Sequence, residues 1–489
     1  MPGPDTKTLV RGASVMLPAT LLGNALLLGL DTYLNGVLPL AEYGMYGAVK
    51  RLLQILGFVG LLGMENAVIR VVARAPGAAS AQAGLRAALV ATLAASSLLA
   101  LGIYALADLV ATWVDDAPGT ATALRLGALS LPFAAVRLLA VAAAQGWGTL
   151  VPRAVVTFLA WPVLQFLGFF ALARAYGDTG IAAVGGYTLA MAVGAGHAWW
   201  SLGRVRPPGA EGEAGEGSLA GMFAVAWPLW AQGMGMALYT WADQVVLAGL
   251  RGAEAAGTYG PVATIAPLFG LGLGALNTAF APVIARKHAE GDKAGLQAMY
   301  RLVTRWAVLL AVPPAAVALV APMTALAPWP NASAEAATAL RVTAIAQLAC
   351  TAVGSVNYLL IMCGRQRDTL YNAVPAVLIN LSLSVLLVPR LGVTGAALAN
   401  GTAMVVANVA GLVQVWRHLR IHPFAPGLLR ALLAGLAPAA VAYLAPGGWL
   451  GVGIVAVAGG AGFVASVRAL GLDEFDRLLV DTFRKRFRA

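Results

Sequence analysis

Apolar runs long enough to cross a bilayer recur from one end of this 489-residue chain to the other, and they limit its possible folds more than any other feature. The hydrocarbon core of a bilayer is about 30 Å thick, and an α-helix of about 20 residues crosses it. Hydrophobic residues make up 60% of the sequence and charged residues only 11%, whereas soluble domains carry about 25% charged residues. The sequence therefore predicts an all-α polytopic membrane protein and excludes a soluble globular one.

The apolar runs and the polar breaks between them predict about fourteen transmembrane helices. Their expected bounds are 12–38, 45–72, 86–112, 121–146, 152–174, 180–202, 219–248, 258–285, 303–327, 338–363, 370–389, 394–416, 427–445 and 449–469. The longest hydrophilic connector follows the sixth span and is rich in Gly, Pro and Glu, which is typical of a flexible linker. The expected organisation is an N-lobe at 1–202, a cytoplasmic linker at 203–218, a C-lobe at 219–418, two extra spans within 419–471 and a tail at 472–489.

The formal net charge of +11 is distributed unevenly along the chain. If the N-terminus is cytoplasmic, most of the 32 Lys and Arg residues fall on inner loops and span ends, as the positive-inside rule requires. Both termini are therefore expected in the cytoplasm. The tail at 472–489 has apolar residues at helical spacing, acidic residues early and basic residues late, which predicts an amphipathic helix on the inner leaflet. The basic excess thus faces membrane lipids, and no nucleic-acid partner is expected.

The segment around the first outer loop recurs in the second half of the chain. The sequence AEYGMYG at 41–47 returns as AEAAGTYG at 253–260, and an intramembrane aspartate precedes each copy, Asp31 and Asp243. An even number of spans separates the copies, so both begin on the same side of the membrane. We therefore expect two parallel six-helix lobes around a central cavity, followed by two extra C-terminal helices, which is an architecture of transporters.

Asp31 and Asp243 are candidate functional residues because a charge at the bilayer centre costs at least about 2.5–3.5 kcal/mol and must face protein or water. They could couple transport to an H⁺ or Na⁺ gradient, or they could form structural ion pairs between helices. The residues alone leave both interpretations open. No other cofactor is expected, and Cys350 and Cys363 lack the spacing of a metal site.

Three cationic side chains form the predicted substrate site. Arg137 lies near the middle of the fourth span, and Lys50 and Arg51 open the second span on its outer side. Guanidinium groups bind phosphate oxygens in a bidentate manner, and lysine supplies a compact charge. The three residues therefore predict a site for an anionic substrate. Snorkelling to the interface is the alternative for Lys50 and Arg51, and it fits the mid-span Arg137 poorly.

The other polar residues within the apolar spans have less specific interpretations. Glu65 and Arg70 lie near the inner end of the second span, where we expect a gating or structural role. Several amides could line a sugar-sized cavity or join helices by hydrogen bonds, which is the commoner use. These amides are Asn24, Gln165, Gln232, Asn277, Asn357 and Asn380.

The repeated segments resemble a known family. Residues 34–74, with AEYGMYG followed by LLGMENAVIRVVAR, resemble the opening of Wzx-type polysaccharide flippases of the multidrug/oligosaccharidyl-lipid/polysaccharide exporter superfamily. The second copy resembles the start of that family's second lobe, through ADQVVLAGLRGAEAAGTYG at 242–260, LNTAFAPVIAR at 276–286 and the EGD stretch at 290–292. The resemblance covers nearly the whole chain, and its motifs are more specific for the superfamily than for a substrate.

The resemblance implies an alternating-access flippase in a bacterial or archaeal cytoplasmic (inner) membrane. Its substrate would be a polyisoprenyl-pyrophosphate-linked oligosaccharide for cell-surface polysaccharide biosynthesis, and a polysaccharide polymerase would be a partner. The family's cationic residues do not align here position by position. Arg137, Lys50 and Arg51 therefore rest on the charge argument alone.

Two other classes of function compete with this interpretation. A cation-coupled multidrug antiporter of the same superfamily would use intramembrane carboxylates, which Asp31 and Asp243 could supply, although Arg137 favours an anionic glycolipid. A membrane enzyme usually presents its reactive groups on a sizeable extramembrane loop or domain, and the outer connectors here are short. The four histidines lie near inner span ends or loops and form no catalytic pattern. We therefore expect a transporter and not an enzyme.

Overall fold

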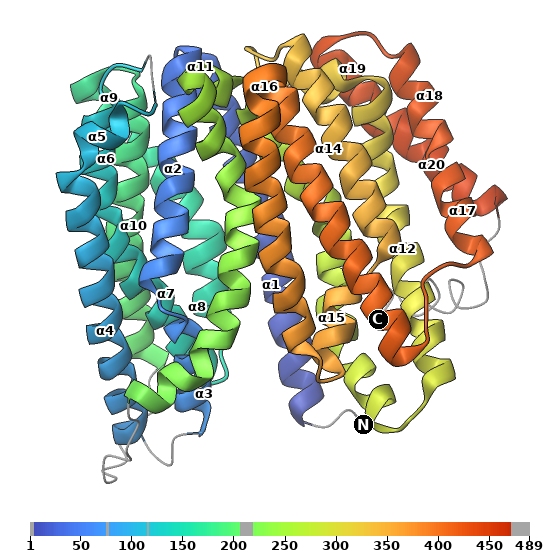
Figure 1. Ribbon diagram of the computed structural model, residues 1–489, viewed down its shortest axis with the longest axis horizontal. Helices are drawn as coiled ribbons and strands as arrows, with labels where there is room; N and C mark the ends of the chain where they lie inside the picture. The colour runs from blue at the N-terminus through green and yellow to red at the C-terminus, as the bar shows by residue number, and fades with distance from the viewer. Residues whose placement is uncertain (1–3, 75–77, 115–116, 206–218, 471–489) are drawn as a thin grey trace. The chain divides into compact units, whose positions relative to one another are not determined.

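The protein is all-α over the part of the chain that the computed structural model describes (Figure 1). The structure describes residues 4–74, 78–114, 117–205 and 219–470. The all-α membrane fold predicted from the sequence is thereby confirmed. Residues 206–218 of the predicted linker and the predicted tail at 472–489 lie outside the described residues.

The chain forms two compact units, residues 1–260 and 261–489, which we call unit 1 and unit 2. Unit 1 contains α1 Pro4–Val37, α2 Leu40–Gly60, α3 Met64–Arg74, α4 Ala78–Ala105, α5 Ala107–Ala111, α6 Thr120–Ala128, α7 Ser130–Gly146, α8 Val151–Arg153, the π-helix η1 Ala154–Ala160, α9 Trp161–Tyr176, α10 Gly180–Val205 and the first part of α11 Leu219–Ala289. Unit 2 contains the rest of α11, α12 Lys293–Val320, α13 Pro322–Ala325, α14 Ala334–Val353, α15 Val356–Met362, α16 Gln366–Leu419, α17 Pro426–Leu433, α18 Leu436–Leu444, α19 Gly448–Ile454, the π-helix η2 Val455–Gly459 and α20 Gly460–Ala469. The two units divide after residue 260, within α11, whereas the predicted lobes divide at the linker 203–218. The lobe boundaries and the cavity between the lobes stay predictions.

Two long helices turn back on themselves, so that each of them supplies two spans (Figure 1). α16 turns at Gly392, whose φ is 55°, and α11 turns at Gly252, whose φ is 83°. Glycine adopts these left-handed angles without the strain that a Cβ would bring. Beyond Gly392 the chain returns antiparallel to the first half of α16. This brings Asn372 and Gln414 together, and their amides exchange hydrogen bonds of 2.7 and 2.9 Å.

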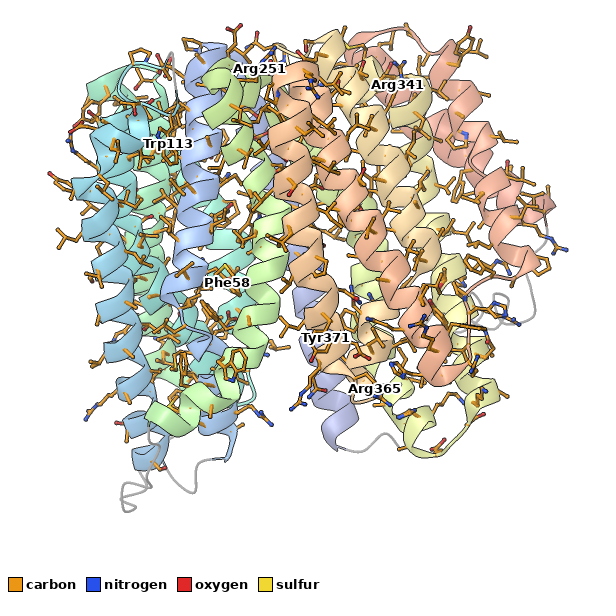
Figure 2. All side chains as sticks on the ribbon, in the orientation of Figure 1. Phe58, Trp113, Arg251, Arg341, Arg365 and Tyr371 are labelled. Atoms are coloured by element: carbon orange, nitrogen blue, oxygen red, sulfur yellow. The ribbon has the colours of Figure 1, made fainter. Side chains whose placement is uncertain are left out.

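The number of spans agrees with the sequence. Within the described residues, ten helical segments are long and apolar enough to cross a membrane, and the bent pair of α2 and α3 makes eleven. Dividing α11 and α16 at their turns and adding the 34-residue α1 gives the fourteen predicted spans. In unit 2, Arg341 lies at one end of the bundle and Arg365 lies near the other (Figure 2), as expected for residues at opposite ends of one span.

The second span differs from its predicted form. The sequence predicts one helix at 45–72, whereas α2 begins at Leu40, and α3 is bent from it by 46°. Gly63 at the bend has a φ of 71° and lies against the beginning of α11. A Cβ on Gly63 would lie only 2.8 Å from the carbonyl oxygen of Ala226. The bend therefore depends on a glycine that both turns the backbone and leaves room for a neighbouring helix.

The EGD stretch that carries part of the family resemblance forms the connection between α11 and α12. Asp292 accepts Lys287 Nζ at 2.6 Å with one oxygen and the backbone N–H of Gly295 at 2.7 Å with the other. The second bond caps the N-terminus of α12. The Lys287 hydrogen bond and, after it, the Gly295 N–H hold the pKa of Asp292 below its usual value, because both stabilise the charged carboxylate.

The repeated segments of α2 and α11 cross each other within unit 1 at paired glycines. A Cβ on Gly44 would collide with the carbonyl oxygen of Ala253, and a Cβ on Gly257 would collide with that of Leu40. The two contacts are equivalent, because Leu40 and Gly44 stand four residues apart in one copy, as Ala253 and Gly257 do in the other. Helix backbones approach this closely only where side chains are absent. The sequence repeat is therefore also a pair of equivalent packing surfaces.

We expect Gly44→Ala to destabilise the protein, because overpacking a close contact costs about 1–3 kcal/mol. Gly102→Ala in α4 is a matched control, since no atom lies within 4 Å of a Cβ at that position. Thermal unfolding of the purified protein in detergent should give a lower midpoint for Gly44→Ala and no lower midpoint for Gly102→Ala. An unchanged midpoint for Gly44→Ala would contradict the close crossing.

Candidate functional site within the membrane helices

Each predicted intramembrane aspartate accepts a hydrogen bond from a tyrosine hydroxyl. Tyr43 of α2 donates to Asp31 Oδ2 at 2.9 Å, and Tyr259 donates to Asp243 Oδ2 at 2.7 Å. The backbone N–H of Gln244 donates to the other oxygen of Asp243 at 2.8 Å. A buried carboxylate needs such donors because it has lost its hydration. The repeat thus carries a Tyr–Asp pair in both copies, while ion coupling and a structural ion pair both stay predictions.

The tyrosines of the two pairs are not equivalent in the repeat. Tyr259 aligns with Tyr46, since each precedes the last glycine of its motif, but Tyr43 is the residue that bonds the aspartate in the first copy. Tyr46 instead accepts Lys50 Nζ at 3.1 Å and Gln165 Nε2 at 2.6 Å. The first copy therefore uses this tyrosine to join a cation of α2 to the amide of α9.

Lys50 and Arg51 lie deeper in their helix than the sequence predicts. Because α2 begins at Leu40, Lys50 lies about 15 Å along the helix axis from the first residue and not at the start of the helix. Its ammonium group also lies 5.1 Å from the centroid of the Tyr46 ring. Arg51 Nη1 donates to Gln54 Oε1 of the same helix at 3.1 Å. Lys50 is thus held within the bundle, while Arg51 is bonded on its own helix.

Arg137 is a buried cation. It lies in α7 and is only 6% exposed. Its guanidinium carbon lies 5.6 Å from the centroid of the Trp161 ring, and that ring packs edge-on against Tyr187 at 6.1 Å. Among the residues that the structure describes, no hydrogen-bond partner meets Nε or Nη1 of Arg137. A cation–π contact is worth about 1–2 kcal/mol and replaces only part of the lost hydration.

Trp161 and Gln165 connect Arg137 to Lys50. The two α9 residues stand four positions apart, so they lie on one face of the helix. Gln165 is 1% exposed and bonds Tyr46, while Trp161 lies beneath Arg137. We call Lys50, Tyr46, Gln165, Trp161 and Arg137 the polar cluster. It combines positive charge with N–H donors, a chemistry that suits the oxygen atoms of an anion.

Glu65 pairs with a residue that the sequence analysis does not select. Arg153 Nη2 lies 3.3 Å from Glu65 Oε1, and Arg153 Nη1 donates to Gln145 Oε1 at 2.6 Å. Arg70, the other residue predicted for a gating or structural role, is exposed on α3. The ion pair therefore joins α3 to α8, and the amide joins α8 to α7.

Five side chains of the site are missing from the sequence-based prediction. Tyr43, Tyr46 and Tyr259 carried a usable signal, because all three belong to the repeated motif that follows an intramembrane aspartate. Trp161 and Arg153 carried none, since a tryptophan within an apolar span and a basic residue near the end of a span are both ordinary in membrane proteins. Their contacts depend on helix packing alone.

A family model described as "Polysaccharide biosynthesis protein" matches residues 9–288, which is more than half of the chain. A second model, MatE, matches residues 228–386. No match was found among curated proteins.

Solved structures with this fold include transporters of two kinds. The chain is similar to "Lipid II flippase MurJ, inward closed conformation" with a TM-score of 0.72 and 13% identity, covering 94% of this chain and 98% of the other. An inward-facing "multidrug resistance MATE family transporter of the MOP superfamily" follows with a TM-score of 0.65 and 15% identity, covering 83% and 98%. The Vibrio cholerae MATE transporter VcmN in its bent form has a TM-score of 0.55 and 16% identity, covering 85% and 98%. At these identities the similarity establishes a shared fold.

Removing the tyrosine partner of Asp243 should destabilise the protein. Tyr259→Phe leaves a buried carboxylate oxygen without its donor, which costs about 1–3 kcal/mol. Tyr443→Phe is the matched control, because that side chain is 76% exposed. Thermal unfolding should show a lower midpoint for Tyr259→Phe alone. Equal midpoints for the two variants would show that the hydroxyl does not support Asp243.

Proposed function

The chain belongs to the polysaccharide biosynthesis protein family and is a membrane transporter of the multidrug/oligosaccharidyl-lipid/polysaccharide exporter superfamily, and on that premise we propose that it is a lipid-linked oligosaccharide flippase. Its substrate is a polyisoprenyl-pyrophosphate-linked oligosaccharide, which it moves to the outer leaflet by alternating access. The product serves cell-surface polysaccharide biosynthesis.

The single observation that supports this substrate is the burial of Arg137 with donor nitrogens that no described residue meets. A guanidinium buried in a membrane helix, with Nε and Nη1 unpartnered among the described residues, offers two donor nitrogens and a full charge to a ligand. A pyrophosphate presents several anionic oxygens, which arginine binds in its fork geometry. Lys50, at the other end of the polar cluster, adds a second positive charge. A cationic drug would meet repulsion at both residues.

The second candidate function is an H⁺- or Na⁺-coupled multidrug antiporter. The MatE match at 228–386 includes Asp243, and this buried carboxylate is the kind of group that binds a cation. In either function, we propose Asp31 and Asp243 as the residues that couple transport to an ion gradient. The charge of the polar cluster favours the glycolipid over the drug.

The proposed location is the cytoplasmic membrane, with both termini inside. The substrate lipid and the surrounding membrane lipids are then the immediate partners. A polysaccharide polymerase acting on the translocated product is a further proposed partner. Nucleic acid is not among them.

We expect Arg137→Ala to reduce flipping by about 10- to 100-fold, the effect of losing a charge-assisted contact worth about 1.5–3 kcal/mol. Arg137→Lys should retain part of the activity, because it keeps the charge but loses the bidentate geometry. The measurement is a leaflet assay in proteoliposomes, in which the purified protein makes a polyprenyl-pyrophosphate oligosaccharide accessible on the opposite face, with and without an H⁺ or Na⁺ gradient.

Arg174→Ala supplies the matched control for this assay, because Arg174 is an exposed cation near the end of α9. Its activity should equal that of the wild type. Wild-type flipping by a folded Arg137→Ala protein would refute Arg137 as the phosphate anchor. Efflux of a cationic dye without movement of the glycolipid would instead identify a drug antiporter.

Reporter fusions should place the linker at 203–218 and the C-terminus in the cytoplasm. The even number of spans before each position, together with the positive-inside distribution of Lys and Arg, requires this topology. A fusion to an outer loop such as the one that contains Gly119 is the control and should report the opposite side. A C-terminus on the outside would contradict the fourteen-span count.

A further inference from the structure

One face of the fifth span carries a row of buried polar atoms that have no hydrogen-bond partner among the described residues. Thr157, Trp161 and Gln165 follow one another at four-residue intervals, so their side chains lie above one another on the helix formed by η1 and α9. Among the described residues, no hydrogen-bond partner meets Thr157 Oγ1, Trp161 Nε1 or Gln165 Oε1, and all three atoms are buried. Arg137, with its two unpartnered donors, lies over the middle member of the row.

Thr157 differs from helical threonines such as Thr92 and Thr351. Thr92 donates its hydroxyl to the carbonyl of Ala88 at 2.8 Å, and Thr351 donates to that of Gln347 at 2.8 Å. These intrahelical bonds satisfy a threonine in an apolar surrounding. Thr157 makes no such bond, and it lies in the π-helical turn η1. Short π-helical turns are rare in proteins, and those that occur are often found at functional sites.

Gln165 has a polar atom to spare in either orientation of its amide. One end of the amide meets the Tyr46 hydroxyl at 2.6 Å, and the other end has no partner among the described residues. Exchanging the oxygen and nitrogen atoms changes which of them faces Tyr46. The atom at the opposite end lacks a described partner in both orientations. Native proteins contain few buried polar atoms of this kind, and each one has a cost. A row of them beside an unpartnered guanidinium therefore indicates a ligand.

The atoms of the row define the chemistry of that ligand. Arg137 and Trp161 can only donate hydrogen bonds, so they require oxygen acceptors. With Nε2 of Gln165 facing Tyr46, the free atom is Oε1, which can only accept, and Thr157 can do both, so the two residues suit hydroxyl or amide groups. A small inorganic anion would leave Gln165 Oε1 unsatisfied. A ligand with anionic oxygens next to hydroxyl groups, which is a sugar phosphate, matches the whole set.

We propose that Thr157, Trp161 and Gln165 form a sugar subsite that binds the first sugar attached to the pyrophosphate, with Arg137 holding the phosphate. This inference rests on the proposed flippase function and deepens it. The fifth span then selects the glycan, because its polar atoms meet sugar hydroxyls. Thr157 to Gln165 spans about 12 Å along the helix axis, from a rise of about 1.5 Å per residue.

The test measures equilibrium binding to the full-length protein in lipid nanodiscs. The two probes are undecaprenyl pyrophosphate and the same lipid pyrophosphate carrying a single N-acetylglucosamine. The variants are Thr157→Val, Gln165→Leu and Arg137→Ala. Thr92→Val is the matched control, because Thr92 is a buried threonine of unit 1 whose hydroxyl is already bonded within its helix.

The wild type and Thr92→Val should bind the sugar-bearing lipid more tightly than the bare one. Thr157→Val and Gln165→Leu should each lose about 2- to 10-fold of affinity for the sugar-bearing lipid, the effect expected for one hydrogen bond. The affinity of Thr157→Val for the bare lipid should not change. Arg137→Ala should weaken the binding of both lipids. Thr157→Val breaks no hydrogen bond of the described structure, so a loss of binding in this variant is not explained by misfolding. Gln165→Leu, by contrast, loses the bond to Tyr46.

Equal affinity of the wild type for the two lipids would overturn the sugar subsite while leaving the flippase proposal in place. An equal loss for both lipids in Thr157→Val would do the same. Failure of the wild type to bind either lipid would overturn the proposed function itself. The three results differ, so the failure of the subsite and the failure of the function are distinguishable.

Discussion

The structure depends on one constraint, which is that the hydrocarbon core of a bilayer offers no water to polar groups. The helices meet this constraint for the backbone, because each one bonds its own N–H and C=O groups. The side chains meet it in pairs, as in the two Tyr–Asp contacts and in the reciprocal amides of Asn372 and Gln414. By contrast, buried polar atoms of Arg137, Trp161 and Thr157 have no hydrogen-bond partner in the part of the chain that the structure describes. They are costly in the isolated protein, and a ligand with complementary atoms would remove that cost.

The internal repeat has kept its packing more closely than its polar contacts. Gly44 and Gly257 make equivalent backbone contacts, because any side chain at either position would push the crossing helices apart. The aspartate partner, by contrast, has moved from one tyrosine of the motif to another, which leaves Tyr46 to bond Lys50 and Gln165. A duplicated helix pair can thus preserve its geometry while one copy acquires a different polar role.

The fold alone does not decide what this transporter carries. It is shared at 13–16% identity with a lipid II flippase and with MATE transporters, one of them described as a multidrug resistance transporter, so one fold serves different functions. Substrate choice must therefore come from the charges that face the ligand. The buried Arg137 and the half-buried Lys50 support the proposal of an anionic glycolipid, and ion coupling by Asp31 and Asp243 stays a prediction in either case.

The sequence by itself determined the all-α membrane fold, the number of spans, the repeat and the candidate status of Arg137 and the two aspartates. These features are local, since the length and apolarity of a span, or a charge within it, can be counted along the chain. Only the tertiary structure decided that Glu65 meets Arg153, that α2 starts early and bends from α3, and that Tyr46 bonds Gln165 across 119 positions. Those contacts follow from the way helices pack side by side, which depends on the rotation and depth of each helix and is not a periodic property of any one segment.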